Sequence, residues 1–188
     1  MKELSDKILT RNRRRDVLKF LYSSQKGLII HSSAIESSGV SFIFAGVADV
    51  GKSTLAKKLS NIMTVINDDM NILEFTDNGI RVSTYFTQAE NQGYHYLINE
   101  DVTGILKAVL FPIKEYERDS FIEPLTDKGL IWRKLLTCVA PPITGEDHLF
   151  PNYYEMIDRL MDSVPFFNIY HNLKDSPEFI AELLRSIK

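Results

Sequence analysis

Eight consecutive residues of this chain form a complete phosphate-binding motif. Residues 46–53 read Gly-Val-Ala-Asp-Val-Gly-Lys-Ser, which matches G-x-x-x-x-G-K-[ST] at every fixed position. Backbone N–H groups of such a loop can bind phosphate oxygens, and the positive end of the following helix dipole adds to the attraction. Lys52 would contact the β- and γ-phosphates, and the Ser53 hydroxyl would ligate Mg²⁺. We expect nucleotide phosphates to bind Gly46, Val47, Ala48, Asp49, Val50, Gly51, Lys52, Ser53 and Thr54.

Two adjacent carboxylates are the second candidate for chemistry. Asn67-Asp68-Asp69 ends an apolar run and begins 15 residues after Lys52. One carboxylate could lie beside the metal, and the other could accept a proton from an attacking hydroxyl. Mutual repulsion would raise one of the two pKa values toward neutrality. The alternative is that these three residues only form a turn with a helix cap.

The elements on both sides of the loop are those that the motif requires. Residues 40–45 form an apolar run typical of a buried strand, and the residues from Ser53 to Ser60 show helical spacing, with Leu55 and Leu59 on one face. A chance match in a tight turn is the alternative, and both flanks argue against it. Residues 27–31 form another short strand, and Ser37-Ser38-Gly39 predicts a hairpin between the two strands.

The rest of the chain alternates strands with amphipathic helices, which is typical of one α/β domain. We expect further strands at 62–66, 72–75, 80–83, 104–111 (stopped by Pro112), 121–125 and 164–170, the last near a sheet edge. We expect helices at 3–22, from a Thr126 cap to Leu136, at 152–163, and after a Ser176 cap. In the 152–163 helix, four residues are expected to face inward: Tyr153, Met156, Ile157 and Leu160. Residues 84–103 read as an irregular loop, in which Phe86, Tyr94, His95 and Tyr96 either cover an acceptor site or simply pack.

Composition places this chain among ordinary globular proteins. Its 188 residues are 44% hydrophobic and 25% charged, with a net charge of −3, so no global basic field attracts DNA. The single cysteine, Cys138, lies in an apolar run and is expected to pack as a small hydrophobe in a reducing compartment. No signal peptide and no run of 18 apolar residues is found, so we expect a cytoplasmic protein without a membrane span.

Positive charge is concentrated near the N-terminus. Residues 1–26 hold eight Lys and Arg against three Asp and Glu, and Arg11, Arg13, Arg14 and Arg15 form most of that excess. The run could contact RNA, an acidic partner or phosphate, but the more common role is a solvated helix face. We therefore divide the chain into an N-terminal basic helical segment, 1–26, and a phosphate-loop domain, 27–188.

His31, the hairpin, the loop at 46–53 and the Asp68-Asp69 pair resemble, in order and spacing, the catalytic domain of bacterial HPr kinase/phosphorylase and its serine-kinase-like relatives. Weaker similarity extends the resemblance over residues 27–170. It implies a fold related to phosphoenolpyruvate carboxykinase, with a mixed, strongly bent sheet around the phosphate loop. It also implies ATP- and Mg²⁺-dependent transfer of phosphate to a hydroxyl, usually a serine, and allows a homo-oligomer, because relatives assemble into oligomers.

The resemblance also implies roles for individual residues. Asp68 would be the general base, Asp69 would support Mg²⁺ together with Ser53, and His31 would lie beside the transferred phosphate. Without the resemblance, His31 could be a strand-end histidine that hydrogen bonds to backbone. A phosphate clamp could come from Arg81, Lys107, Arg118 or Arg133, among which the sequence does not choose.

Two departures from the family pattern limit what the resemblance implies. The loop has Ala48-Asp49 where the family commonly has Ser-Gly; Asp tolerates a left-handed backbone, but its carboxylate would weaken anion binding unless it points away. The glycine-rich signature of the HPr-modifying enzymes is missing, and their separate N-terminal domain has no room. We therefore expect the acceptor to be another protein, a peptide or a small hydroxyl compound.

Two other functions compete with a kinase. A non-catalytic or regulatory ATP-binding module would explain Asp49 and the missing signature. A GTPase is suggested by residues 101–104, which match D-x-x-G, and by Asn172-Leu173-Lys174-Asp175. The guanine-reading motif requires Lys directly after Asn, however, and Leu173 intervenes.

Overall fold

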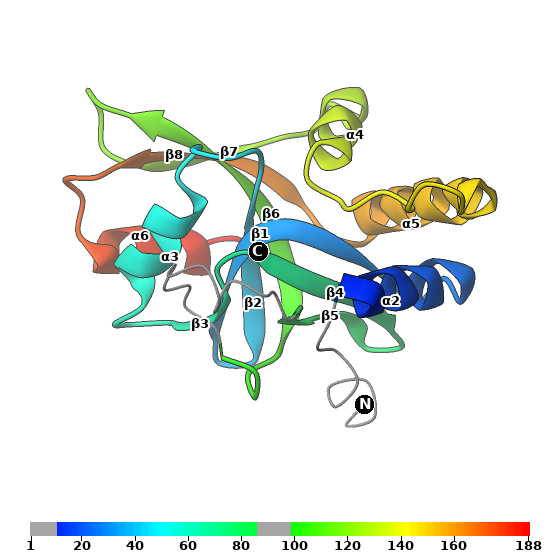
Figure 1. Ribbon diagram of the computed structural model, residues 1–188. Helices are drawn as coiled ribbons and strands as arrows, with labels where there is room; N and C mark the ends of the chain where they lie inside the picture. The colour runs from blue at the N-terminus through cyan, green and yellow to red at the C-terminus, as the bar shows by residue number, and fades with distance from the viewer. Residues whose placement is uncertain (1–10, 86–98) are drawn as a thin grey trace.

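Strands from the whole chain pair into one mixed sheet, with helices on both faces (Figure 1). The structure is a computed structural model and describes residues 11–85 and 99–188. The strands are β1 (Gly27–Ser37), β2 (Val40–Ala45), β3 (Thr64–Asn67), β4 (Met70–Thr76), β5 (Gly79–Thr84), β6 (Gly104–Glu115), β7 (Phe121–Pro124) and β8 (Phe166–Asn172). The helices are α2 (Arg11–Ser23), α3 (Lys52–Leu59), α4 (Lys128–Leu136), α5 (Phe150–Ser163) and α6 (Pro177–Arg185), with a 3-10 turn, η2 (Asp147–Leu149).

The sheet bends back on itself. Its order is β2-β1-β4-β5-β6-β8-β7, and β3 pairs with β1 outside this path. Because β2 also pairs with β6, the five strands β2, β1, β4, β5 and β6 close a ring. Parallel pairs (β2 with β6, β6 with β8) combine with antiparallel ones, so the prediction of a mixed, strongly bent sheet is confirmed.

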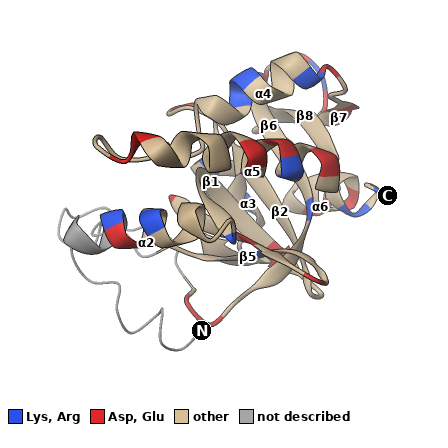
Figure 2. Ribbon diagram, turned by 90° about the vertical axis from the view of Figure 1, so that its right-hand side faces the viewer, with Lys and Arg blue, Asp and Glu red and all other residues tan. Residues whose placement is uncertain are grey.

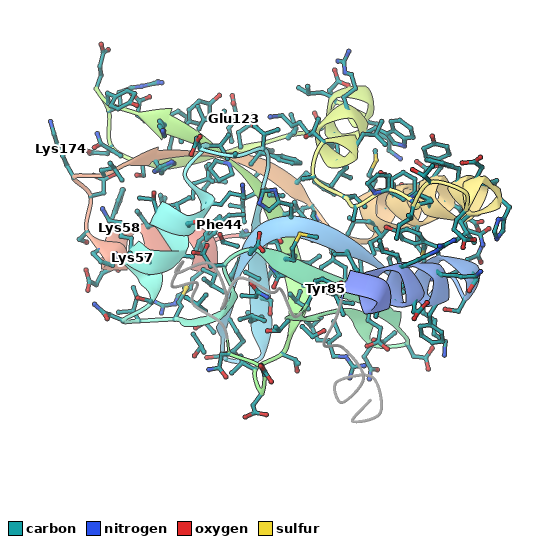
Figure 3. All side chains as sticks on the ribbon, viewed as in Figure 1. Phe44, Lys57, Lys58, Tyr85, Glu123 and Lys174 are labelled. Atoms are coloured by element: carbon teal, nitrogen blue, oxygen red, sulfur yellow. The ribbon has the colours of Figure 1, made fainter. Side chains whose placement is uncertain are left out.

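Two hydrophobic cores lie on opposite sides of the sheet. Figure 1 shows α3 and α6 on one side and α2, α4 and α5 on the other. The smaller core joins Leu55 and Leu59 of α3 to Ile180 and Leu184 of α6, with Phe44 of β2 beneath them (Figure 3). The larger core includes the four residues of α5 that were expected to face inward, Tyr153, Met156, Ile157 and Leu160. Burial of these apolar faces fixes both helix layers on the sheet.

The predicted hairpin before the loop is present, but its first strand is longer than expected. Strand β1 continues to Ser37, and the two-residue turn Ser38-Gly39 has φ values of 55° and 83°. Positive φ at both positions is the geometry that matches the strand twist in tight hairpins. The prediction stopped at His31 because Ser32 and Ser33 break the apolar pattern, yet both serines are fully buried.

Pro112 does not end its strand, which corrects the expected boundary at Phe111. Strand β6 runs to Glu115, and Pro112 pairs with Ile169 of β8. Val109 donates its N–H toward β8, to Pro165 O, at 3.2 Å. By alternation the nitrogen of Pro112 faces the other edge, where pairing with β2 has ended at Leu110. A proline there removes no ladder hydrogen bond.

Other boundaries differ by one to a few residues. The cap of α4 is Asp127, not Thr126: its side chain accepts the N–H of Leu130 at 2.9 Å. Strand β3 begins at Thr64 rather than 62, because residues 62 and 63 still turn back onto α3. The Ser176 cap of α6 is confirmed by its 3.2 Å hydrogen bond from Phe179 N–H. Strand β8 spans 166–172 and lies beside the edge strand β7, as expected for a strand near an edge.

Helix α2 covers one end of the larger core. Val17, Leu18, Leu21 and Tyr22 are buried there. From the basic run, Arg15 reaches Glu146 at 3.1 Å. Figure 2 shows charged residues along α2, α4 and α5, whereas the strands behind them are mostly uncharged. None of the helices described here is long and apolar enough to cross a membrane. The start of the predicted 3–22 helix and most of the predicted 84–103 loop lie outside the described residues.

Candidate active site

Strand β1 lies between β2 and β3, and the loops that follow these two strands lie at the same end of the sheet. Ala34 pairs with Ile43 of β2 on one side and with Asn67 of β3 on the other. Both neighbours run antiparallel to β1, so they are parallel to each other and end at the same edge. Two strand spacings separate them, roughly 10 Å. The residues that follow are Gly46–Ser53 after β2 and Asp68-Asp69 after β3, which explains why motifs 15 residues apart lie close together.

The backbone of the glycine loop adopts left-handed conformations at several positions. Gly46, Asp49 and Gly51 have φ values of 144°, 64° and 107°. The left-handed Asp49 is the conformation that its residue type was expected to tolerate. Helix α3 then begins at Lys52 without any side-chain cap. The first N–H groups of a helix have no partner within the helix, so here they are left for a ligand.

Lys52 connects the glycine loop with the Asp68-Asp69 corner. Its side chain folds under the loop, where Nζ donates to Val47 O at 2.8 Å, and the residue is only 6% exposed. Burial lowers the pKa of the Lys52 amine. The nearby acidic groups, including Asp68 and Asp69, act in the opposite direction and favour the charged form. The cation therefore lies in the field of both carboxylates.

Asp68 points inward, toward two hydroxyl groups. Ser33 Oγ donates to Asp68 Oδ1 at 2.5 Å, and Ser33 itself is fully buried. Burial raises the pKa of the Asp68 carboxyl, while hydrogen bonds from Ser33 and from Ser53 of the glycine loop lower it. A buried carboxylate with a raised pKa suits proton transfer near neutral pH.

Asp69 faces His31 from the other side of the corner. His31 Nε2 lies 3.6 Å from Asp69 Oδ1, and the backbone of Asp69 accepts the N–H of Ser32 at 2.9 Å. Burial and, to a smaller extent, the positive charge of Lys52 lower the pKa of His31. The negative charges of Asp69 and Asp68 act in the opposite direction and raise it. The backbone of His31 donates to Cys138 O at 2.7 Å. The histidine side chain is therefore not a backbone-bonded strand end, and it shares the site with Asp69.

Asn67 gives the corner its shape. Its Oδ1 accepts the N–H of Asp69 at 2.8 Å, and its Nδ2 donates to Tyr85 O at 2.9 Å. Asn67 is fully buried. The segment is a turn between two strands rather than a helix cap, and this turn directs the Asp68 side chain toward Ser33. The simple-turn alternative is thus correct about the backbone, but it leaves the two carboxylates facing the glycine loop.

Three residues of this region carry no motif signal. Ser33 could have been found as the next residue after His31 on the same strand face. Asn67 was seen only as part of the Asn-Asp-Asp run. His171, at the end of β8, is 2% exposed and lies under the loop, with Nε2 3.4 Å from Val50 O. Nothing in the local sequence pairs it with a loop 120 residues earlier.

Cys138 packs as predicted. The residue is buried near Lys52 and Gly46, and burial raises the pKa of its thiol to about 12. At that pKa the thiol stays protonated near neutral pH and is not a nucleophile.

Two of the four candidates for a phosphate clamp, Arg81 and Arg118, form ion pairs with glutamates. Arg81 pairs with Glu74 of the β4–β5 hairpin at 2.5 Å, and Arg118 pairs with Glu115 at 3.0 Å. Arg133 is exposed and Lys107 is half-buried in β6.

The GTPase alternative does not fit the fold. Gly104 of the D-x-x-G match opens β6 next to the start of β2, because Ile105 pairs with Val40, so it lies at the opposite strand end from the glycine loop. Asn172 Nδ2 donates to Arg118 O at 2.9 Å, and Asp175 accepts from Ser120. Both polar side chains thus hold the β6–β7 loop instead of a base.

The donors around the loop fit Mg²⁺. This ion takes oxygen ligands and usually binds through one or two carboxylates plus substrate phosphates. Ser53 is exposed at the start of α3, and Asp69 is partly exposed on the facing corner. Within residues 11–85 and 99–188, no group of three or more His, Cys, Asp or Glu side chains could hold a metal by itself. The phosphates would thus have to complete the coordination.

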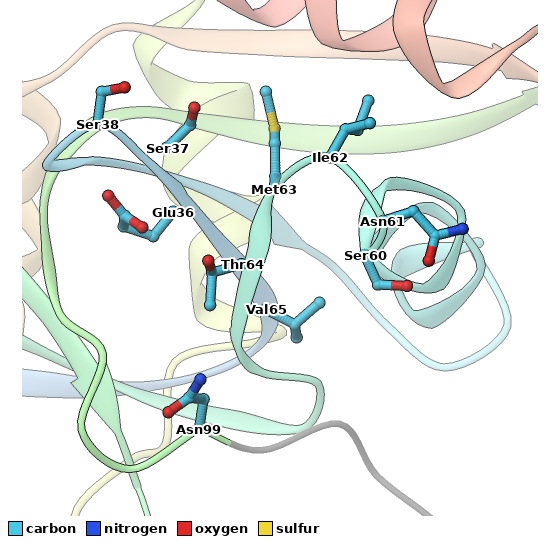
Figure 4. Close-up of a pocket in the computed structure, with 10 residues that line it drawn as sticks. All are labelled: Glu36, Ser37, Ser38, Ser60, Asn61, Ile62, Met63, Thr64, Val65 and Asn99. Carbon is cyan, nitrogen blue, oxygen red and sulfur yellow. The ribbon is translucent and has the colours of Figure 1, made fainter.

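A depression of about 530 Å³ lies apart from these residues (Figure 4). It is formed by the β1–β2 turn, the end of α3, the start of β3 and Asn99. Its lining shares no residue with the site described above, and we assign it no function. Phe86, Tyr94, His95 and Tyr96, the aromatic residues and histidine proposed to cover an acceptor, lie outside the described residues.

Comparisons with known proteins find similarity among solved structures only. No family model matches the sequence, and no curated protein matches it. Among solved structures, the chain is similar to the HPr(Ser) kinase/phosphatase from Coxiella burnetii. The identity is 15%, the match covers 84% of this chain and 88% of that chain, and the TM-score is 0.44. A likeness of this size says nothing about function, so the family resemblance stays a prediction.

Proposed function

We propose that this chain is an ATP-dependent phosphotransferase that moves the γ-phosphate to a hydroxyl of a protein, peptide or small molecule. One observation carries the proposal: β2 and β3 flank β1 in parallel, so the glycine loop and the Asp68 corner follow at the same end of the sheet, where Asp68 lies in the field of Lys52. A phosphate-binding loop and a buried carboxylate therefore lie near each other. Phosphoryl transfer needs mainly positioning and charge stabilisation, together with a group that accepts or orients the hydroxyl proton.

The proposed reaction is a direct transfer of the γ-phosphate to the acceptor hydroxyl. The acceptor oxygen attacks the γ-phosphorus and forms the new O–P bond, while the bond to the β,γ-bridging oxygen breaks and ADP leaves with that electron pair. The acceptor proton passes to the Asp68 carboxylate, and Lys52 stabilises the phosphate charge. Ser53 and Asp69 would hold Mg²⁺, which neutralises phosphate charge when bound. His31, beside Asp69, would contact the transferred phosphate.

The test compares two Asp→Asn variants of the full chain. Asp68→Asn should lower Mg²⁺-dependent consumption of ATP by about 10²–10⁴-fold, the usual range for a general base, while binding of a non-hydrolysable ATP analogue survives. Asp77→Asn, in the exposed β4–β5 turn, makes the same chemical change and should leave turnover unaltered. Radiolabelled γ-phosphate transfer in a cell extract then identifies the acceptor. Unchanged turnover in Asp68→Asn would exclude this mechanism.

A non-catalytic ATP-binding module is the second candidate, and Asp49 favours it. This carboxylate is exposed in the middle of the glycine loop, and its negative charge raises the pKa of Lys52. Negative charge there opposes bound phosphate. If the chain only binds nucleotide, the wild-type protein will bind the ATP analogue and Asp49→Gly will bind it more tightly, but neither will consume ATP.

A further inference from the structure

His171 occupies an unusual place beneath the glycine loop. It comes from the end of β8, whose pairing with Lys114 of β6 fixes its position, and it is 2% exposed. Its Nε2 lies 3.4 Å from the carbonyl oxygen of Val50. A Cβ atom added at Gly51 would clash with the same nitrogen. The ring therefore contacts the loop directly at the residue before α3.

The geometry points to His171 as a positioning residue for phosphate binding, an inference that rests on the proposed function. A carbonyl oxygen can only accept, so the contact requires the proton of the neutral ring on Nε2. No peptide bond in the described chain is cis, and in a trans peptide the C=O and N–H groups point in opposite directions. With the Val50 carbonyl held down toward His171, the N–H of Gly51 points up and away from the protein interior.

That N–H is one of the donors a phosphate would use. Gly51 has φ 107° and is the N-cap of α3, with no side chain capping the helix. If the peptide between Val50 and Gly51 flipped, it would turn a carbonyl oxygen toward the phosphate and remove a donor. His171 opposes that flip, and Gly51 leaves the space that the imidazole ring fills. The loop is thus held in its anion-binding form before the ligand arrives.

The charges around the ring keep it neutral. Burial lowers the pKa of His171, and the positive charges of Lys114 and Lys58 lower it further, while the Val50 contact opposes them. Lys58, labelled on α3 in Figure 3, donates from Nζ to Leu173 O at 2.7 Å, which holds its charge near the end of β8. A neutral ring with a single N–H has one donor, and Val50 is its partner.

Two variants of His171 separate the effect of its N–H donor from the effect of its side-chain size. His171→Gln keeps an N–H group at a similar reach, whereas His171→Leu keeps a side chain of similar size without any donor. We expect His171→Leu to weaken binding of a non-hydrolysable Mg²⁺–ATP analogue by about tenfold, the value of one hydrogen bond, and His171→Gln to remain within about threefold. Equal affinity of wild type and His171→Leu would overturn the inference. Equal losses in both variants would also overturn it, because bulk or ring shape would then be the cause.

A measurement on the wild-type protein keeps the inference testable if a variant does not fold. Nitrogen NMR of the imidazole at pH 7.5 should show the proton of His171 on Nε2, and a ring protonated only on Nδ1 would refute the contact. This readout needs no nucleotide. If the wild-type chain binds no triphosphate while the Nε2–H tautomer is present, the proposed function fails but the contact with the loop stands.

Discussion

Replacement of Ser33 by alanine tests whether Asp68 is held as a charged group. The Ser33 hydroxyl donates to Asp68 Oδ1 at 2.5 Å, and neither residue is exposed by more than 9%. A hydrogen bond to a charged group is worth about 1.5–3 kcal/mol. Its loss should therefore raise the Asp68 pKa further, beyond the rise that burial already causes.

The stability of Ser33→Ala should then depend on pH in a defined direction. The folded-state pKa of Asp68 is above its unfolded value of 3.8, so folding favours the protonated form. The cost of burying the charge is present at high pH and disappears as pH falls through the folded pKa. We expect the variant to lose about 1.5–3 kcal/mol of unfolding free energy at pH 8.5, and distinctly less at pH 5.

The assay is urea denaturation at both pH values, with Ser32→Ala as the matched control. Ser32 is equally buried, but the hydrogen bonds of its hydroxyl among the described residues are with the neutral groups Ile30 O and Asn71 Nδ2. The control should therefore lose the same free energy at pH 5 and at pH 8.5. If the two variants show the same pH dependence, Asp68 is not the charged partner of Ser33 and the reasoning is refuted. If turnover is detected, the acidic limb of its pH profile should also shift to higher pH in Ser33→Ala but not in Ser32→Ala.

Three further predictions concern the loop and its support. Lys52→Ala should weaken ATP-analogue binding at least tenfold in calorimetry, whereas Lys57→Ala, on the exposed face of the same helix, should bind like wild type. Gly51→Ala should abolish analogue binding, because φ 107° strains any other residue and the new Cβ meets His171; normal affinity would show that the loop can relax. The pKa of His171 is lowered below its ordinary 6.5, so the unfolded state binds more protons just below that pH. Wild-type melting temperature should therefore fall more between pH 7 and 5.5 than that of His171→Gln, and parallel curves would contradict this.

The sequence predicted the parts of the fold that hydrophobic period and turn chemistry determine. The strand–loop–helix unit at 40–60 and the inward face of α5 followed from such patterns. The end of β1 was missed because Ser32 and Ser33 are not apolar. Hydrogen bonds compensate for the burial of these two residues. Pro112 was misjudged because its effect depends on which strand edge its nitrogen faces, and that follows only from the sheet order.

The residues of the candidate site were likewise predicted only in part. Lys52 and Ser53 follow from a local motif, and the nearness of Asp68 and Asp69 follows from two parallel strands that share β1 as their neighbour. Strand alternation could have placed Ser33 on the same face as His31, but not its contact with Asp68, 35 residues away. His171 could not be predicted at all, because its partner Val50 lies 121 residues away along the chain. Contacts of this kind are set by tertiary packing, which leaves no periodic trace in the sequence.

The most direct test of the central claim uses Mn²⁺ in place of Mg²⁺ with a non-hydrolysable ATP analogue. The bound paramagnetic ion broadens nearby backbone resonances in an isotope-labelled sample. We expect selective broadening at residues 46–54 and at Asp68 and Asp69. Broadening instead around the depression at Ser60 and Thr64, with those loop resonances untouched, would contradict it.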